Sequence, residues 1–120
     1  MLEVYGIKNC NTVKKSLTWL EEKKISYEFL DVKKSVLSES LLKLWMNNMP
    51  KPFIWENLIN KSGMTWRKLP DSEKNIELDK KQAIKLIMKN ASIMKRPIIL
   101  KDKKILTIGF DELEFKEKIL

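Results

Sequence analysis

The sequence predicts an α/β fold whose mixed sheet is built from a βαβ unit, a helical insertion and a ββα unit. Three observations lead to this prediction. A short apolar run followed by an amphipathic helix pattern opens the chain, within residues 2–24. Helical patterns fill most of the middle of the chain. Near its end, two apolar runs around a polar turn, within residues 98–108, predict an antiparallel hairpin.

The first unit is expected to be a strand, a helix and a parallel strand. Val13, Leu17 and Leu20 are spaced by four and three residues, so they share the buried face of the helix, whereas Ser16 falls on another face. A strand, a helix and a strand that follow one another so closely in the sequence imply two parallel strands joined by a right-handed crossover. The first strand is apolar enough to be buried on both faces. The predicted ranges are residues 2–7, 11–24 and 26–31.

The chain is expected to form a single domain of residues 1–120. Its insertion, at about residues 37–92, is expected to be mainly helical. Pro50 and Pro52 end its first helix, and Asp79 can cap its last helix together with Gln82. A segment with turn residues and no period, residues 62–69, is predicted to be a loop. The predicted helical segments are residues 38–49, 53–60, 71–77 and the segment that follows Asp79 through residue 90.

The last unit is the hairpin of residues 98–108 followed by a helix that Asp111 can cap. Leu113 and Ile119 are expected to pack inward from this helix. The complete pattern is that of a thioredoxin-like sheet with helices on both faces. By analogy with that fold, Pro97 begins the third strand opposite the cysteine, and the peptide bond before it is expected to be cis.

Composition narrows the classes of function. The chain has 120 residues, a formal net charge of +8, one cysteine and no histidine. Without histidine, zinc sites and serine–histidine triads are effectively excluded, and no metal is expected. The lysines are interleaved with acidic residues, which predicts a solvated surface and no direct nucleic-acid binding. A single cysteine fits the reducing cytoplasm; we expect no signal peptide, no membrane span and a monomer.

Cys10 lies between the first predicted strand and the first predicted helix, at the first turn of that helix. Backbone N–H groups there have no partner within the helix, and the helix dipole adds partial positive charge. Both effects favour the thiolate, lower the pKa of the thiol from its usual ~8.5 and suit a nearby anion. A free cysteine is also often a small buried hydrophobic residue. The spacing alone favours neither interpretation.

Arginine is scarce, because only Arg67 and Arg96 among the 24 basic residues are arginines. The guanidinium group is a planar fork that binds carboxylates and oxyanions through two hydrogen bonds. Both arginines are therefore candidates for anion binding, although two cases also fit chance.

Three groups of residues resemble the arsenate reductase (ArsC)/Spx family, which contains arsenate reductases, the Spx and MgsR regulators and ArsC-like proteins. The groups are YGIKNCNT (residues 5–12), TWRK (residues 65–68), and KRPII (residues 95–99) with Gly109-Phe110. They span almost the full chain, and their combination and order are specific. The first two groups are most similar to the ArsC-like reductases.

The resemblance implies roles for the matching residues. Cys10 is the nucleophile, and the two arginines hold an oxyanion or the carboxylate of a thiol co-substrate. Backbone N–H groups at the start of the helix contribute to the same site. The residues expected to bind the anion or substrate are Asn11, Thr12, Val13, Arg67, Arg96 and Pro97, with Lys8 and Trp66 as further candidates.

Two departures from the family bear on function. Arsenate reductases carry a further arginine near the last strand, where this chain has Ile108 to Asp111, so efficient arsenate reduction is not expected. The redox-sensing regulators carry Cys-x-x-Cys, whereas Val13 takes the second position here. A single-thiol reaction remains, in which Cys10 attacks sulfur or arsenic and an outside thiol such as glutathione resolves the adduct without a bound cofactor.

Three functional hypotheses follow. The first is a thiol-dependent, glutathione-coupled reductase of the ArsC-like type that acts on a small oxyanion or a disulfide. The alternative is an Spx- or MgsR-like transcriptional regulator that binds the alpha subunit of RNA polymerase. The third is a thioredoxin-like module whose buried thiol is idle.

Overall fold

A computed structural model describes residues 1–74 and 78–120 of the chain. The predicted order of a βαβ unit, a helical insertion and a ββα unit is confirmed. In chain order the elements are β1 (Leu2–Gly6), α1 (Asn11–Glu22), β2 (Tyr27–Asp31), α2 (Glu39–Asn47), the 3-10 helix η1 (Trp55–Leu58), α3 (Met64–Arg67), α4 (Asp71–Lys74), α5 (Lys80–Lys89), the 3-10 helix η2 (Ala91–Ile93), β3 (Ile98–Lys101), β4 (Lys104–Ile108) and α6 (Glu112–Lys118).

The strands form one mixed sheet in the order β2-β1-β3-β4. β1 and β2 run parallel, with Leu2 opposite Tyr27. β3 is antiparallel to both β1 and β4. The hairpin between β3 and β4 turns through Asp102 and Lys103, whose positive φ angles of 52° and 66° match the twist of tight hairpin turns. This is the predicted thioredoxin-like α/β arrangement.

Alternate residues of the strands serve two separate cores. On one face of the sheet, Val4 and Ile99 pack with residues of α1 and α6. On the other face, Tyr5 and Ile98 pack with the helical insertion. Tyr5 lies edge-on to Trp45 of α2, with 4.9 Å between the ring centroids. β1 is thus buried on both faces, as its apolar sequence predicts.

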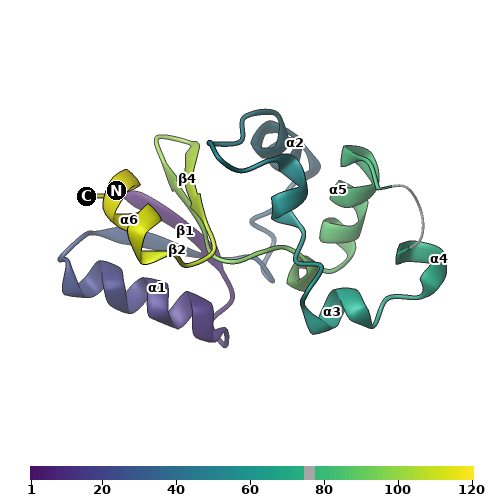
Figure 1. Cartoon of the computed structure of the whole chain (residues 1–120), viewed down its shortest axis with the longest axis horizontal. Coiled ribbons are helices and arrows are strands. Elements are labelled where there is room, and N and C mark those ends of the chain that lie inside the picture. The colour runs from purple at the N-terminus through teal and green to yellow at the C-terminus, as the bar shows by residue number, and fades with distance from the viewer. Residues whose placement is uncertain (75–77) are drawn as a thin grey trace.

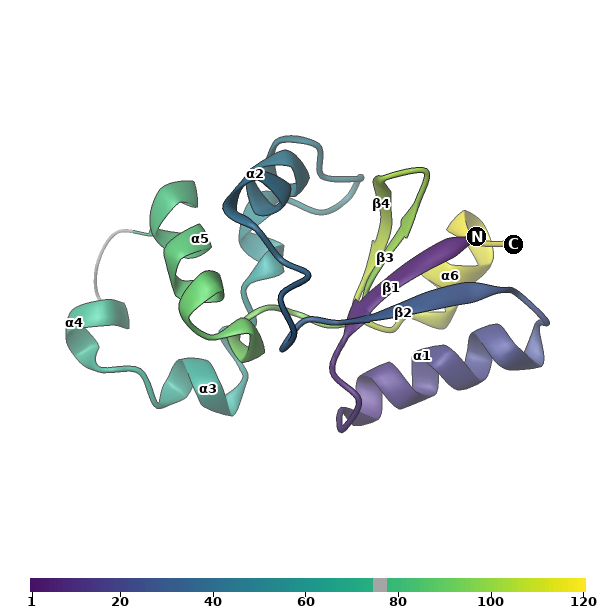
Figure 2. The ribbon, with the colours of Figure 1, turned by 180° about the vertical axis from the view of Figure 1, so that it is seen from behind.

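The molecule is elongated, with extents of 45 × 27 × 27 Å. Figures 1 and 2 show the sheet, α1 and α6 towards one end of the long axis and α3 to α5 towards the other. The chain enters the insertion after β2 and returns through the segment that precedes β3. Among the helices of the described ranges, none is both long enough and apolar enough to cross a membrane.

The predicted cap at Asp111 is confirmed, and so is the half of the predicted Asp79–Gln82 capping box in which Asp79 is the acceptor. The carboxylate of Asp79 accepts the N–H of Gln82 at 2.8 Å before α5. The carboxylate of Asp111 accepts the N–H of Glu114 at 3.1 Å before α6. Each bond satisfies a backbone donor that has no partner within its helix, which is why these caps can be predicted from local sequence.

The prediction of a loop at residues 62–69 is wrong. Met64–Arg67 forms α3, and the carbonyl of Gly63 accepts the N–H of Arg67 at 3.2 Å. Trp66 packs against the core of the insertion and stabilises this turn. A single helical turn is too short to show a hydrophobic period. The helix expected at residues 53–60 is likewise reduced to the shorter η1.

Two predicted side-chain orientations are wrong. Ser16 is fully buried in α1, where its hydroxyl donates to the carbonyl of Thr12 at 2.8 Å. That bond satisfies the hydroxyl and makes its burial tolerable. Leu113 is 72% exposed, and Phe115 fills the core instead. The helical turn expected at residues 71–77 is present as α4, and residues 75–77 lie outside the described ranges.

Candidate active site

Cys10 is the residue that caps the N-terminus of α1. Its backbone is extended, with φ of −123° and ψ of 122°, and its carbonyl accepts the N–H of Lys14 at 2.9 Å. Its side chain forms no capping hydrogen bond of its own. The thiol is half-buried beside the N–H groups of the first turn. The predicted position at the start of the helix is therefore confirmed.

The packing of α1 on β1 determines where this thiol lies. Gly6 ends β1, and a Cβ atom at this position would come within 3.0 Å of Cγ2 of Val13 and 3.3 Å of Cε1 of Phe29. Val13 is fully buried in the first turn of α1. Because Gly6 lacks a side chain, the first turn of α1 can lie directly against the end of the strand.

Arg96 lies on the segment that returns from the insertion to the sheet. The peptide bond between Arg96 and Pro97 is cis, as expected from the fold analogy. Nη1 of Arg96 donates to the carbonyl oxygens of Ser92 at 2.8 Å and Met94 at 3.0 Å. Two backbone acceptors on one nitrogen hold the guanidinium group in place, so its charge has a defined position.

The surroundings of Cys10 lower the pKa of its thiol. Burial acts in the opposite direction and raises the pKa. Its effect on the pKa is outweighed by the nearby backbone N–H of Val13, by the nearby guanidinium group of Arg96 with its positive charge, and by the N–H of Thr12. The thiolate is the form of cysteine that attacks sulfur, so this environment favours nucleophilic chemistry without a histidine.

Cys10 lines a pocket of about 490 Å³. The start of α1, the return segment before β3, and the segment from β4 into α6 contribute to its walls, and the insertion contributes residues between α2 and α3. The lining contains charges of both signs and two aromatic rings. These residues are Lys95, Arg96, Asp111, Glu114, Phe53 and Phe110.

Three predicted site residues, Cys10, Thr12 and Arg96, meet in this pocket. The backbone N–H of Val13 helps to lower the pKa of the thiol, while the side chain of Val13 is buried. Pro97 is buried next to Arg96. The roles of these five residues in binding a substrate remain predictions.

Other predicted site residues lie outside the pocket lining. Arg67 and Trp66 belong to α3, which Figure 1 shows on the side of the insertion, between α1 and α4 along the long axis. Arg67 is exposed, and Trp66 is half-buried against the insertion. Lys8 and Asn11 are exposed in the chain on either side of Cys10. Direct participation of these four residues stays a prediction.

Sequence reasoning missed the wall formed by Pro52, Phe53 and Asp111. Asp111 was expected only as a helix cap. The hairpin register could have indicated Gly109, whose N–H donates to the carbonyl of Pro97 at 2.9 Å. No local signal places Pro52 or Phe53 here, because they approach from the insertion. The peptide bond before Pro52 is a second cis bond, which was not predicted.

The comparison with protein families classifies the chain. The model of the ArsC family matches residues 5–118, which include both Cys10 and Arg96. The chain belongs to the ArsC family. The resemblance seen in the sequence is therefore confirmed, and the ArsC-family match extends across the sheet and the insertion.

Relatives of this ArsC-family protein have names of three kinds. An "uncharacterized protein" of Haemophilus influenzae is 42% identical, over 97% of this chain and 96% of its own length. The "global transcriptional regulator Spx" of Listeria innocua is 29% identical, over 97% of this chain and 85% of its own length. An arsenate reductase (ArsC) related protein from Brucella melitensis has a TM-score of 0.75 at 36% identity, covering 97% of this chain and 92% of its own.

The fold is also that of the YffB (PA3664) protein, which has a TM-score of 0.88 at 32% identity and matches 100% of both chains. This agreement covers the sheet and the whole insertion. The thioredoxin-like α/β fold with its helical insertion is therefore common to this chain and its solved relatives.

Proposed function

We propose that this ArsC-family protein is a thiol-dependent reductase that uses Cys10 as its nucleophile and glutathione, or another small thiol, as co-substrate. One observation carries the proposal. Despite its burial, the thiol of Cys10 has a lowered pKa, and it lies with Arg96 in an accessible pocket. Similarity to an arsenate reductase (ArsC) related protein supports the same class of reaction.

The proposed reaction is a thiol–disulfide exchange in two steps. The Cys10 thiolate attacks the glutathione sulfur of a mixed disulfide, the S–S bond breaks, and the electron pair leaves on the other sulfur, which takes a proton from water. A glutathione thiolate then attacks the glutathione sulfur bound to Cys10 and returns the electron pair to Cys10. The net reaction converts one mixed disulfide and one glutathione into a free thiol and oxidised glutathione.

The charges of the pocket favour a disulfide of this kind over arsenate. Lys95 and Arg96 supply positive charge for a carboxylate. Asp111 adds negative charge to the same lining, in the segment where arsenate reductases carry a further arginine. Glutathione carries both an ammonium group and carboxylates, so its disulfide suits this lining of mixed charge better than the small dianion arsenate does.

The decisive experiment is turnover of the mixed disulfide of glutathione and mercaptoethanol, with glutathione as reductant and the formation of oxidised glutathione as readout. Cys10→Ser should abolish the enzyme-dependent rate, because the hydroxyl group is not a comparable nucleophile. Arsenate in place of the disulfide should give much slower turnover. A Cys10→Ser variant that retains the wild-type rate would refute the proposal.

A transcriptional regulator is the second candidate function, because the Spx relative aligns over 97% of this chain. Its partner would be the alpha subunit of RNA polymerase. Val13 occupies the place of a second cysteine, so such a regulator would not use an internal disulfide. A pull-down with the C-terminal domain of the alpha subunit tests this candidate, and absence of binding at micromolar concentration opposes it. Either function belongs in the cytoplasm.

A further inference from the structure

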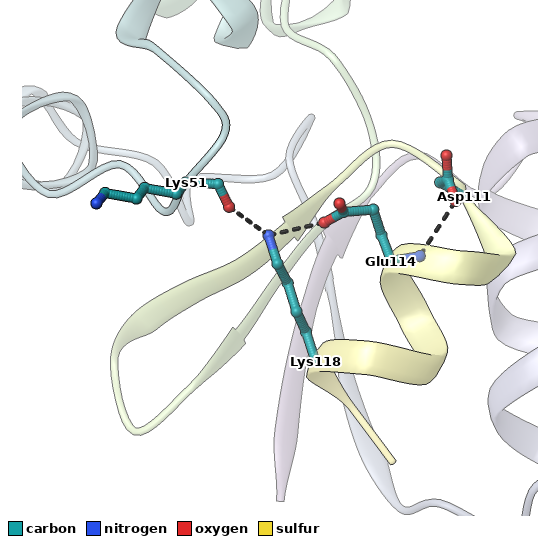
Figure 3. Close-up of polar contacts among 4 residues, drawn as sticks. All are labelled: Lys51, Asp111, Glu114 and Lys118. Carbon is teal, nitrogen blue, oxygen red and sulfur yellow. Dashed lines mark hydrogen bonds and ion pairs between the residues drawn. The ribbon is translucent and has the colours of Figure 1, made fainter.

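Lys118, the last residue of α6, contacts three groups at or next to the wall of the Cys10 pocket, because Phe53 and Glu114 line it and Lys51 precedes the lining residue Pro52. Its Nζ atom donates to the backbone carbonyl of Lys51 at 2.6 Å and lies 2.7 Å from Oε2 of Glu114. Figure 3 shows both contacts, with the side chain of Lys51 pointing away from Lys118. The same nitrogen lies 5.1 Å from the ring centroid of Phe53. The ammonium group of Lys118 thus makes a hydrogen bond to a carbonyl, an ion pair with a carboxylate and a cation–π contact with an aromatic ring.

These contacts join two distant parts of the chain. Lys51 and Phe53 belong to the connection between α2 and η1, whereas Glu114 and Lys118 belong to α6, which packs on the sheet. Phe53 and Glu114 both line the pocket. The side chains of Lys118 and Glu114 are only 22% and 23% exposed, so solvent and salt screen their ion pair less than a fully exposed pair.

We propose that Lys118 is a positioning residue of the Cys10 pocket, which holds the segment from Lys51 to Phe53 against α6 and neutralises Glu114 in the pocket wall. The hydrogen bond to the carbonyl is charge-assisted and therefore strong. The cation–π contact with Phe53 favours a fixed ring position. This inference rests on the proposed function only in that a glutathione-containing disulfide is the ligand that enters the pocket.

The neutralisation of Glu114 has a separate consequence. Without the ammonium group, the carboxylate of Glu114 would add an uncompensated negative charge to a pocket that already contains the Cys10 thiolate. Like charges at such distances repel, most strongly where solvent is partly excluded. Lys118 therefore favours the entry of anionic ligands without touching the reacting sulfur.

Alkylation of Cys10 tests the neutralisation without requiring turnover. Iodoacetate and iodoacetamide are similar in size, but only iodoacetate is charged. At a pH where Cys10 is fully ionised, K118M should lower the ratio of the iodoacetate rate to the iodoacetamide rate about three- to tenfold. K118R should keep the wild-type ratio, and K118M combined with E114Q should restore it. K116M, at an exposed position of the same helix, is the matched control.

Formation of the mixed disulfide of Cys10 with glutathione tests the positioning of the wall. Mass spectrometry gives the rate at which oxidised glutathione modifies Cys10, and the iodoacetamide rate corrects for thiol reactivity. The K118M/E114Q variant should lose about threefold or more of this corrected rate, because Phe53 is no longer held although the charge is balanced. A purely structural role would lower Tm and leave both ratios unchanged.

The outcomes separate this inference from the proposed function. If K118M matches K116M in the alkylation ratio and K118M/E114Q keeps the wild-type corrected rate, the positioning role of Lys118 is overturned, whatever the turnover. If wild-type protein fails to turn over the mixed disulfide but K118M and K118M/E114Q change these two quantities as expected, the reductase proposal fails and the role of Lys118 stands.

Discussion

Cys10 and Arg96 line one pocket although Cys10 follows β1 and Arg96 precedes β3. The antiparallel pairing of these neighbouring strands, with Tyr5 opposite Ile98, places the end of β1 and the start of β3 at the same edge of the sheet. The carbonyls of Ser92 and Met94 then hold the guanidinium group of Arg96. The sheet and the return segment together therefore place a fixed positive charge beside the thiol.

The pH dependence of Cys10 alkylation should reveal this arrangement. Burial raises the pKa of the thiol, but the Val13 N–H and Arg96 outweigh burial and make the net shift a lowering. The midpoint in wild-type protein should thus lie below the ordinary ~8.5, and Arg96→Ala should raise it. Iodoacetamide rates measured across the pH range give the midpoints. Lys43→Ala is the control, because Lys43 is exposed on α2 and does not line the Cys10 pocket. A rise in that variant as large as in Arg96→Ala would contradict the assignment.

The same lowered pKa predicts a pH-dependent stability. At pH values between the pKa of Cys10 in the folded protein and its ordinary pKa of ~8.5 in the unfolded chain, the unfolded chain binds more protons than the folded one. The free energy of unfolding therefore increases with pH in this interval. This contribution is fully present above the unfolded pKa and is lost as pH falls through the folded pKa. Urea unfolding of wild-type protein and Cys10→Ser, compared at each pH, measures it. A difference between the two that is constant with pH would show that the thiolate is not stabilised.

The contact between Gly6 and Val13 predicts a specific double-mutant result. Gly6→Ala should reduce the free energy of unfolding by about 1–3 kcal/mol, because the new Cβ would lie 3.0 Å from Cγ2 of Val13. Val13→Ala removes both methyl groups that oppose it. The two substitutions together should cost less than the sum of their separate effects in urea unfolding. Simple additivity would contradict the close packing of α1 on β1.

Phe115 and Leu113 should differ strongly in their importance for stability. Phe115 is fully buried and lies edge-on to Trp19, with 5.2 Å between the ring centroids, whereas Leu113 is 72% exposed. Phe115→Ala should cost about 3–5 kcal/mol of unfolding free energy, and Leu113→Ala should change it by less than about 0.5 kcal/mol. Chemical unfolding of both variants measures the contrast. Comparable losses would mean that α6 packs through a different face.

Several features of the fold follow from local sequence. The strand and helix periods, the caps by Asp79 and Asp111 and the hairpin turn each depend on residues only a few positions apart. Where local signals fail, the cause is tertiary. Trp66 packs one helical turn into place at α3 without any period, and Phe115 displaces Leu113 from the core because the orientation of α6 depends on the sheet it covers.

By itself, the sequence determined the order of the elements and the position of Cys10 at the start of α1, because hydrophobic period and capping are local properties. Only the tertiary structure decided which residues meet the thiol. Arg96 reaches it through antiparallel strand pairing, while Arg67 remains on α3. Phe53 joins the pocket through contacts with α6. Such contacts depend on how the insertion packs against the sheet, and the spacing of residues along the chain does not specify that packing.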